Sequence, residues 1–99
     1  MVKHMIIWKL KEGVDAAAVK AAIKAELEGL VGKIDGLLSM KIETDGFACS
    51  AGDLLMDSSF ESLAALEAYQ SHPAHQAVAN GLVRPNVETR LSYDYEING

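Results

Sequence analysis

A predicted strand at the start of the sequence carries apolar side chains on both of its faces. One face of residues 2–10 is made up of Val2, His4, Ile6, Trp8 and Leu10. The other face places Met5 and Ile7 between two lysines. A strand with one face in water should alternate more cleanly between apolar and polar residues. We therefore expect the fold to cover both faces of this strand.

Two helical regions are predicted from start signals and apolar spacing. Asp15 can cap a helix that begins with three alanines, because its side chain can accept a hydrogen bond from the first turn. The apolar stripe of this helix consists of Val19, Ile23, Leu27, Leu30, Val31 and Ile34. Residues 58–61, Ser-Ser-Phe-Glu, match a capping box and predict a second helix after them. Pro73 interrupts that helix and suits the first turn of a further helical piece, which ends at Pro85.

Three further segments have the two-residue period of a strand: residues 37–44, 53–58 and 87–97. The last of them is the clearest. Its apolar face is formed by Val87, Thr89, Leu91, Tyr93, Tyr95 and Ile97. Its polar face, formed by Glu88, Arg90, Ser92, Asp94 and Glu96, is most simply a face in contact with water.

The predicted elements follow one another in the order β-α-β-β-α-β. This order is typical of an α+β fold of the ferredoxin-like kind, in which both helices lie on one face of an antiparallel sheet. The second face of such a sheet is bare in a monomer. Because the first strand is apolar on both faces, we expect a homodimer in which the sheets of two copies pack together.

Length, charge and cysteine content narrow the class of protein. Ninety-nine residues, 49% of them hydrophobic, suit a single globular domain over residues 1–99. A net charge of −5 without a cluster of basic residues argues against nucleic acid or an anionic membrane as a partner. No apolar run is long enough to span a membrane or to form the core of a signal peptide. The single cysteine, Cys49, allows no internal disulfide, so we expect a cytoplasmic protein.

Residues 69–75, Tyr-Gln-Ser-His-Pro-Ala-His, hold the densest group of side chains that can carry chemistry. Histidine titrates near neutral pH, so His75 could act as a general base that removes a proton next to a carbonyl. Tyr69 could donate a hydrogen bond to a substrate oxygen and stabilise an enolate. Each residue has a structural alternative, His75 as a helix-start residue that hydrogen-bonds across Pro73 and Tyr69 as a core residue.

Three further residues are candidates for a ligand pocket. His4 lies on the same face as Ile6 and Trp8, where a buried polar group needs a partner, so it either lines a cavity or belongs to a satisfied core. Trp8 has the same two alternatives as a large apolar group. His72 precedes a proline, which favours an extended backbone and a structural hydrogen bond over a place in the pocket.

A metal centre is the rival chemistry for the histidines. His72 and His75 are three residues apart, and His4 could be a third ligand. Zinc takes three or four ligands in a tight geometry, and no cysteine, aspartate or glutamate stands in a recognisable spacing with these histidines. We expect neither a metal nor another cofactor.

Pieces of sequence spread over nearly the whole chain carry a family resemblance. They are Val2-Lys3-His4-Met5-Ile6, Lys9-Leu10-Lys11, Ile34-Asp35-Gly36-Leu37, Ser59-Phe60-Glu61-Ser62-Leu63, residues 66–75, Val83-Arg84-Pro85 and Tyr93-Asp94-Tyr95. Together they resemble the stress-responsive A/B-barrel (Dabb) family, and the Tyr-x-x-His-Pro-x-His pattern of residues 69–75 is the most specific of them. The resemblance implies a ferredoxin-like unit whose sheets form a dimeric α/β barrel, and a function that is undefined in most members.

One plant enzyme of that family implies roles for three of these residues. It is a polyketide cyclase that closes a linear polyketide to olivetolic acid by an aldol reaction without a cofactor. By motif position, the resemblance makes His75 the catalytic base and Tyr69 its helper, and it places His4 in the pocket. Leu54 stands where that cyclase has a further pocket histidine, and a pocket tyrosine on its first helix has no match here.

Three functions are compatible with these observations. The first is a small homodimeric protein with a cavity for a small apolar or phenolic ligand. The second is a cofactor-independent enzyme, similar to a polyketide cyclase or an isomerase, with His75 as base and Tyr69 as helper. A purely structural interaction module is a third. Convergence of His4, Tyr69 and His75 on one enclosed space would favour the enzyme, whereas a His75 side chain in solvent would exclude it.

Overall fold

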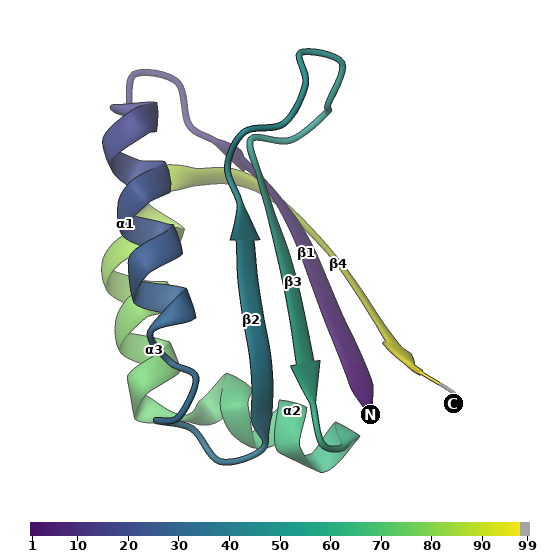
Figure 1. Cartoon of the computed structure of the whole chain (residues 1–99). Coiled ribbons are helices and arrows are strands. Elements are labelled where there is room, and N and C mark those ends of the chain that lie inside the picture. The colour runs from purple at the N-terminus through teal and green to yellow at the C-terminus, as the bar shows by residue number, and fades with distance from the viewer. Residues whose placement is uncertain (98–99) are drawn as a thin grey trace.

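Residues 1–97, which the computed structural model describes, form one antiparallel sheet with helices on one side (Figure 1). The strands are β1 (Val2–Leu10), β2 (Leu37–Glu43), β3 (Leu54–Phe60) and β4 (Val87–Glu96). Their order in the sheet is β2-β3-β1-β4, so β1 is a central strand. This is the ferredoxin-like α+β arrangement that the order of elements predicts. Residues 98 and 99, the end of the predicted domain, lie outside the described residues.

The helical layer consists of one helix between β1 and β2 and of the helical segments between β3 and β4, and it lies on one side of the sheet (Figure 1). Its elements are α1 (Ala16–Glu28), α2 (Leu63–Ser71), α3 (Pro73–Val78), the π-helical segment η1 (Ala79–Val83) and α4 (Arg84–Asn86). Asp15 caps α1 as predicted, and its carboxylate accepts a hydrogen bond from the Ala18 N–H at 3.2 Å. Pro73 opens α3 as predicted, because a proline lacks the N–H that would continue α2.

Two predicted boundaries are wrong. The predicted stripe of the first helix runs to Ile34, but α1 ends at Glu28 and Val31 is 41% exposed. The sequence match to a capping box at residues 58–61 does not begin a helix, because β3 continues through Phe60. That side chain is fully buried in the core, and this burial outweighs the local helix-start signal. The cap of α2 is instead Ser62, whose hydroxyl accepts a hydrogen bond from the Ala65 N–H at 3.1 Å.

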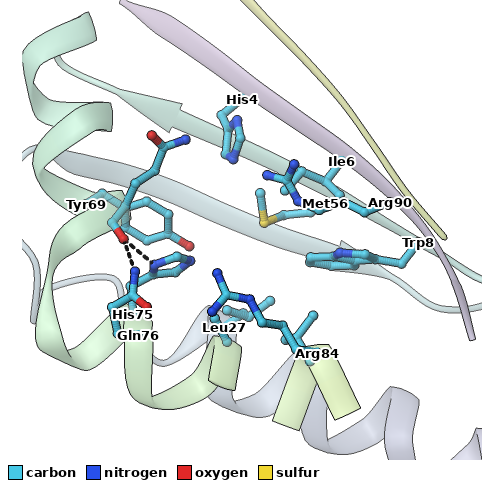
Figure 2. Close-up of a pocket in the computed structure, with 13 residues that line it drawn as sticks. His4, Ile6, Trp8, Leu27, Met56, Tyr69, His75, Gln76, Arg84 and Arg90 are labelled. Carbon is cyan, nitrogen blue, oxygen red and sulfur yellow. Dashed lines mark hydrogen bonds between the residues drawn. The ribbon is translucent and has the colours of Figure 1, made fainter. Parts of the chain in front are cut away.

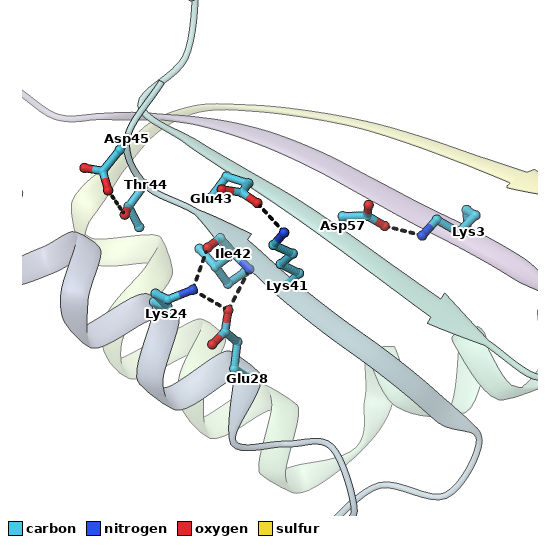
Figure 3. Close-up of polar contacts among 9 residues, drawn as sticks. All are labelled: Lys3, Lys24, Glu28, Lys41, Ile42, Glu43, Thr44, Asp45 and Asp57. Atoms are coloured by element: carbon cyan, nitrogen blue, oxygen red, sulfur yellow. Dashed lines mark hydrogen bonds and ion pairs between the residues drawn. The ribbon is translucent and has the colours of Figure 1, made fainter. Parts of the chain in front are cut away.

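Polar contacts also join the helical layer to the edge strand β2 (Figure 3). Glu28 accepts a hydrogen bond from the Ile42 N–H at 2.9 Å, and Lys24 donates to the Ile42 carbonyl at 3.0 Å. The Lys24 ammonium and the Ile42 N–H hold the pKa of Glu28 below its ordinary value. These contacts occupy backbone groups at an edge that could otherwise pair with another strand.

The side of the sheet away from the helices is largely uncovered in the single chain. Its apolar residues, which we call the open face, are Met5, Ile7, Leu55, Leu91, Tyr93 and Tyr95. They meet across neighbouring strands, since Ile7 pairs with Leu55 and Leu91, and Met5 pairs with Tyr93. Leu91 is 66% exposed and Tyr93 71%. The loop at Gly52 contacts Ile7, but most of this face has no cover among residues 1–97 of one chain.

Candidate functional site

A pocket lies on the helix-facing side of the sheet, between β1, β4 and the helical segments that follow α2 (Figure 2). Its volume is about 420 Å³, within the range of pockets that hold small molecules. Its buried wall consists of His4, Ile6, Trp8, Leu27, Met56, Tyr69, Ala79 and Val83. The polar side chains at its opening are Gln70, His75, Gln76, Arg84 and Arg90. The pocket thus joins a largely apolar wall to a polar opening.

Tyr69 comes from α2 and lies in the pocket wall, where only 1% of it is exposed. Its ring centre is 4.9 Å from that of Phe60 and 4.3 Å from that of His75. The hydroxyl has no hydrogen-bond partner among the residues that the structure describes. Burial raises the pKa of this hydroxyl above its ordinary value, so it keeps its proton at neutral pH. Tyr69 therefore offers a hydrogen-bond donor in the pocket.

His75 is positioned by the break between α2 and α3. Pro73 has no N–H, and the Ala74 N–H donates to His72 Nδ1 at 3.0 Å, so the Gln70 carbonyl lacks its usual helical partner. His75 Nδ1 donates to that carbonyl at 3.2 Å. A carbonyl only accepts, so Nδ1 carries the proton and Nε2 keeps its lone pair in the neutral ring. Burial lowers the pKa of His75 and favours this neutral form.

His4 belongs to the pocket wall and is paired behind it with Asp94 of β4. The two residues stand opposite each other in the β1–β4 register, and His4 Nδ1 donates to the Asp94 carboxylate. His4 is 2% exposed, so this contact satisfies a polar group that would be costly to bury alone. The ring is thus a paired core group and part of the pocket wall at the same time.

Sequence reasoning missed the polar residues that the end of the chain brings to the pocket. Arg90 and Asp94 belong to the polar face of the last strand, which is exposed as expected but lies on the helix-facing side of the sheet. The two-residue period of the last strand could have indicated them, because Arg90 pairs with Trp8 and Asp94 with His4 once β4 is placed beside β1. Arg84 enters the pocket from α4.

Comparison with known proteins decides the family. The family model described as the stress responsive A/B barrel domain matches residues 2–97. This chain belongs to the stress-responsive A/B-barrel domain family. The resemblance drawn from the sequence is therefore confirmed, and the match spans every strand and helix of the described part. No curated protein matches this A/B-barrel chain.

Solved structures share the fold of this A/B-barrel domain. A dimeric protein of unknown function from Bacteroides fragilis, described as having a ferredoxin-like fold, is 26% identical with a TM-score of 0.88 over 97% of this chain and 95% of that one. A Dabb family protein from Mesorhizobium loti is 19% identical, with a TM-score of 0.80 over 99% and 97% of the two chains. A hydroxynitrile lyase from Passiflora edulis is 20% identical, with a TM-score of 0.83 over 98% and 93%. The predicted ferredoxin-like α+β fold is confirmed.

The structure brings four of the predicted site residues together and separates the fifth. His4, Trp8, Tyr69 and His75 all line the pocket of this A/B-barrel domain, but His72 does not. His72 caps α3, which is the structural hydrogen bond that its place before a proline favours. Within residues 1–97, no three histidine, cysteine, aspartate or glutamate side chains gather in a way that could hold a metal ion. No helix in the same range is long and apolar enough to cross a membrane.

Proposed function

We propose that this A/B-barrel protein is a homodimer that binds a small apolar or phenolic molecule in the pocket. A pair of buried donors over an apolar wall carries the proposal, since neither the Trp8 indole N–H nor the Tyr69 hydroxyl has a partner among the described residues. Buried polar groups are usually paired, and an unpaired one costs about 1–3 kcal/mol. A ligand oxygen would accept from these donors while an apolar ligand body packs against Ile6 and Met56.

The open face supports the homodimer. It places Ile7, Leu91 and Tyr93 side by side on two adjacent strands, with their side chains exposed. A contiguous apolar surface of this kind is typical of an interface. A two-fold dimer would bury the same face on both copies. The relative from Bacteroides fragilis is described as dimeric.

A thermal-shift screen of phenols and phenolic acids tests the binding proposal. We expect a ligand that raises the Tm of the wild-type protein and raises that of Tyr69→Phe less, because this variant keeps the ring and loses the donor. Tyr93→Phe is the matched control, since it loses a hydroxyl outside the pocket and should respond like the wild type. An unchanged response of Tyr69→Phe to every phenol that binds would contradict the proposed site.

A second function, cofactor-independent proton transfer, is favoured by the arrangement of His4, Tyr69 and His75 around one pocket (Figure 2). The His75 Nε2 would take a proton from a carbon next to a carbonyl, so that the C–H bond breaks and its electron pair moves to the carbonyl oxygen. The Tyr69 hydroxyl would donate a hydrogen bond to that oxygen. The hydroxynitrile lyase from Passiflora edulis is an enzyme on the same fold.

The product of this reaction depends on where the abstracted proton, now on His75, is transferred. If the enolate attacks a second carbonyl carbon, a C–C bond closes a ring, as in a polyketide cyclase. The proton on His75 then passes to the new alkoxide. If His75 instead returns the proton to a different carbon, the reaction is an isomerisation. Both outcomes leave the protein unchanged and need no oxidant or reductant.

Exchange of the methyl protons of acetophenone for deuterium, followed by NMR in heavy water, tests this second function. We expect the wild-type protein to accelerate the exchange and His75→Ala to lose about 100-fold of that acceleration or more. His72→Asn should exchange like the wild type, because it removes an imidazole outside the pocket and keeps a side-chain acceptor for the cap of α3. Equal acceleration by the wild type and His75→Ala would exclude His75 as the base.

A further inference from the structure

Both arginines of the chain line the pocket. The sequence contains two arginines and seven lysines, and of these nine basic residues only Arg84 and Arg90 belong to the described pocket lining. The chain as a whole is acidic, with a net charge of −5. Its arginines are therefore concentrated at one site rather than spread over the surface.

Neither arginine has an acidic partner within residues 1–97. The ion pairs of this range take their cations from the N-terminus, Lys3, His4, Lys9, Lys24 and Lys41. Arg84 donates to the neutral side chain of Asn80. The pocket-lining residues that the structure describes include no aspartate or glutamate. The positive charge at the opening is thus not neutralised by the pocket itself.

The two guanidinium groups reach the pocket from different elements (Figure 2). Arg84 comes from α4 and Arg90 from β4, and both are exposed at the opening. Burial is the main cause of the lowered pKa of His75, and both arginines lower it further. Arg90 also opposes the rise that burial causes in the pKa of Tyr69. The charges of both arginines therefore act on His75, and that of Arg90 acts on Tyr69.

The pocket offers mainly hydrogen-bond donors. The two guanidinium groups at the opening join the Trp8 N–H and the Tyr69 hydroxyl in the wall. Arginine has five N–H donors in a planar fork that matches a carboxylate through two parallel hydrogen bonds. A ligand that complements this site needs acceptors with negative charge at one end and apolar surface at the other.

We propose that the ligand of this pocket is a small aromatic or branched carboxylate, whose carboxylate group is held by Arg84 and Arg90 and whose apolar body packs against Trp8 and Met56. This inference rests on the proposed function, because it names the chemical class of ligand for the same pocket. The pocket volume of about 420 Å³ restricts the body to a small molecule.

Two probes of nearly the same shape separate charge from apolar packing. They are 4-tert-butylbenzoate and its neutral counterpart 4-tert-butylbenzamide. Trp8 is the only tryptophan of the chain and lies in the pocket wall, so its fluorescence reports on occupancy. We expect the wild-type protein to bind the benzoate about tenfold more tightly than the benzamide. Added salt should reduce that preference, because the arginines are exposed.

Paired variants assign the preference to the arginines. The double variant Arg84→Gln/Arg90→Gln should bind the benzoate and the benzamide equally, and the benzamide as the wild type does. The double variant Lys11→Gln/Lys33→Gln removes the same charge at exposed positions outside the pocket and should keep the preference. Circular dichroism checks the fold of each variant. If the double variant does not fold, the two single arginine variants replace it, and each should lose part of the preference for the benzoate over the benzamide.

The outcomes distinguish the two levels of the proposal. Equal affinity of the wild type for both probes would overturn the carboxylate and leave the binding pocket standing. If the double arginine variant still prefers the benzoate over the benzamide, Arg84 and Arg90 do not bind the carboxylate. Absence of binding by both probes and by every phenol of the thermal-shift screen would overturn the proposed binding function, and the carboxylate with it.

Discussion

The two faces of the sheet start from the same central strand and differ in what covers them. On the helix-facing side, β1 presents His4, Ile6 and Trp8 to a layer that the chain itself supplies. On the opposite side, Ile7 meets Leu91 across the sheet, and both stay exposed although the loop at Gly52 contacts Ile7. One face of β1 is therefore completed within the chain and the other is not.

The polar groups show what this difference means. His4 is buried on the covered side because Asp94 pairs with it, and the donors of Trp8 and Tyr69 are buried there without a protein partner in the described residues. On the other side of the sheet, Lys3 and Asp57 pair with each other, and no buried polar side chain lacks a partner there among the described residues. Buried donors need an acceptor, whereas a flat apolar surface needs only another apolar surface. The covered side thus suits a ligand, and the open face suits a second copy.

Breaking the open face should have the largest effect. In Leu91→Glu, a carboxylate replaces a side chain that is 66% exposed in the single chain and would be buried in the dimer. An unpaired buried charge costs about 3–5 kcal/mol, so we expect the dimer to weaken by about 100-fold or more. Sedimentation velocity at micromolar concentration should then show a monomer.

A second leucine provides the matched control for this variant. Leu63 is 58% exposed on α2, away from the open face, so Leu63→Glu should sediment like the wild type. If Leu91→Glu sediments as a dimer at the same concentrations as the wild type, the open face is not the interface.

A pair of glycines tests how closely the helical layer is seated on the covered face. Gly36 has a φ of +85°, and an added Cβ would lie 2.6 Å from the Cβ of Ala65 in α2. Gly32 has a φ of +89° with nothing within 4 Å. We expect Gly36→Ala to lower the free energy of unfolding by about 2–4 kcal/mol and Gly32→Ala by about 1–2 kcal/mol, because only the first adds a clash to the backbone strain. Equal losses in urea unfolding would refute close packing at Gly36.

The smallest expected effect is on the pH dependence of the unfolding free energy, which a change on the covered side should alter and a change on the open face should not. His75 has a folded-state pKa below its ordinary value of 6.5, so the unfolded chain binds the proton more readily. Its stabilising contribution is complete above that ordinary value and is lost as the pH falls toward the folded-state pKa. His75→Gln should therefore show a flatter profile of unfolding free energy in weakly acidic buffer.

Urea unfolding across this pH range measures the profile. The other charged groups of the pocket, including Arg84 and Arg90, are present in both proteins, so the difference isolates His75. Tyr93→Phe, a change on the open face, should follow the wild-type profile. Parallel profiles of the wild type and His75→Gln would show that burial does not shift this histidine.

The order of elements could be predicted because it depends on local patterns. Asp15 caps α1 through its own first turn, and most of the predicted alternation of residues 87–97 lies within β4. Val87 departs from it, because a register shift places it opposite Leu10 and against the core. The boundary at residues 58–61 failed for the opposite reason. Phe60 lies in a sequence that resembles a helix start, but its burial against Tyr69 keeps it in β3. A contact between distant segments outweighed the local signal there.

The candidate site could be predicted only in part for the same physical reason. Tyr69 and His75 lie in one short segment, so a local pattern finds both. Arg90 and Asp94 reach Trp8 and His4 only through the register of β4 against β1. The sequence shows the two-residue alternation of each strand, but it does not show which strand lies beside it in the sheet. The volume of the pocket likewise depends on how the helical layer packs on the sheet.

The most direct test of a ligand site on the covered face is an NMR titration of isotope-labelled protein with 4-tert-butylbenzoate. The chain has one tryptophan, so the Trp8 indole N–H gives a single resonance from the pocket wall. We predict that this resonance moves in a saturable way, while the side-chain methyl resonances of Ile7 and Leu91 on the open face keep their positions. An unchanged Trp8 resonance at saturating probe, or shifts confined to Ile7 and Leu91, would contradict a ligand site on the helix-facing side.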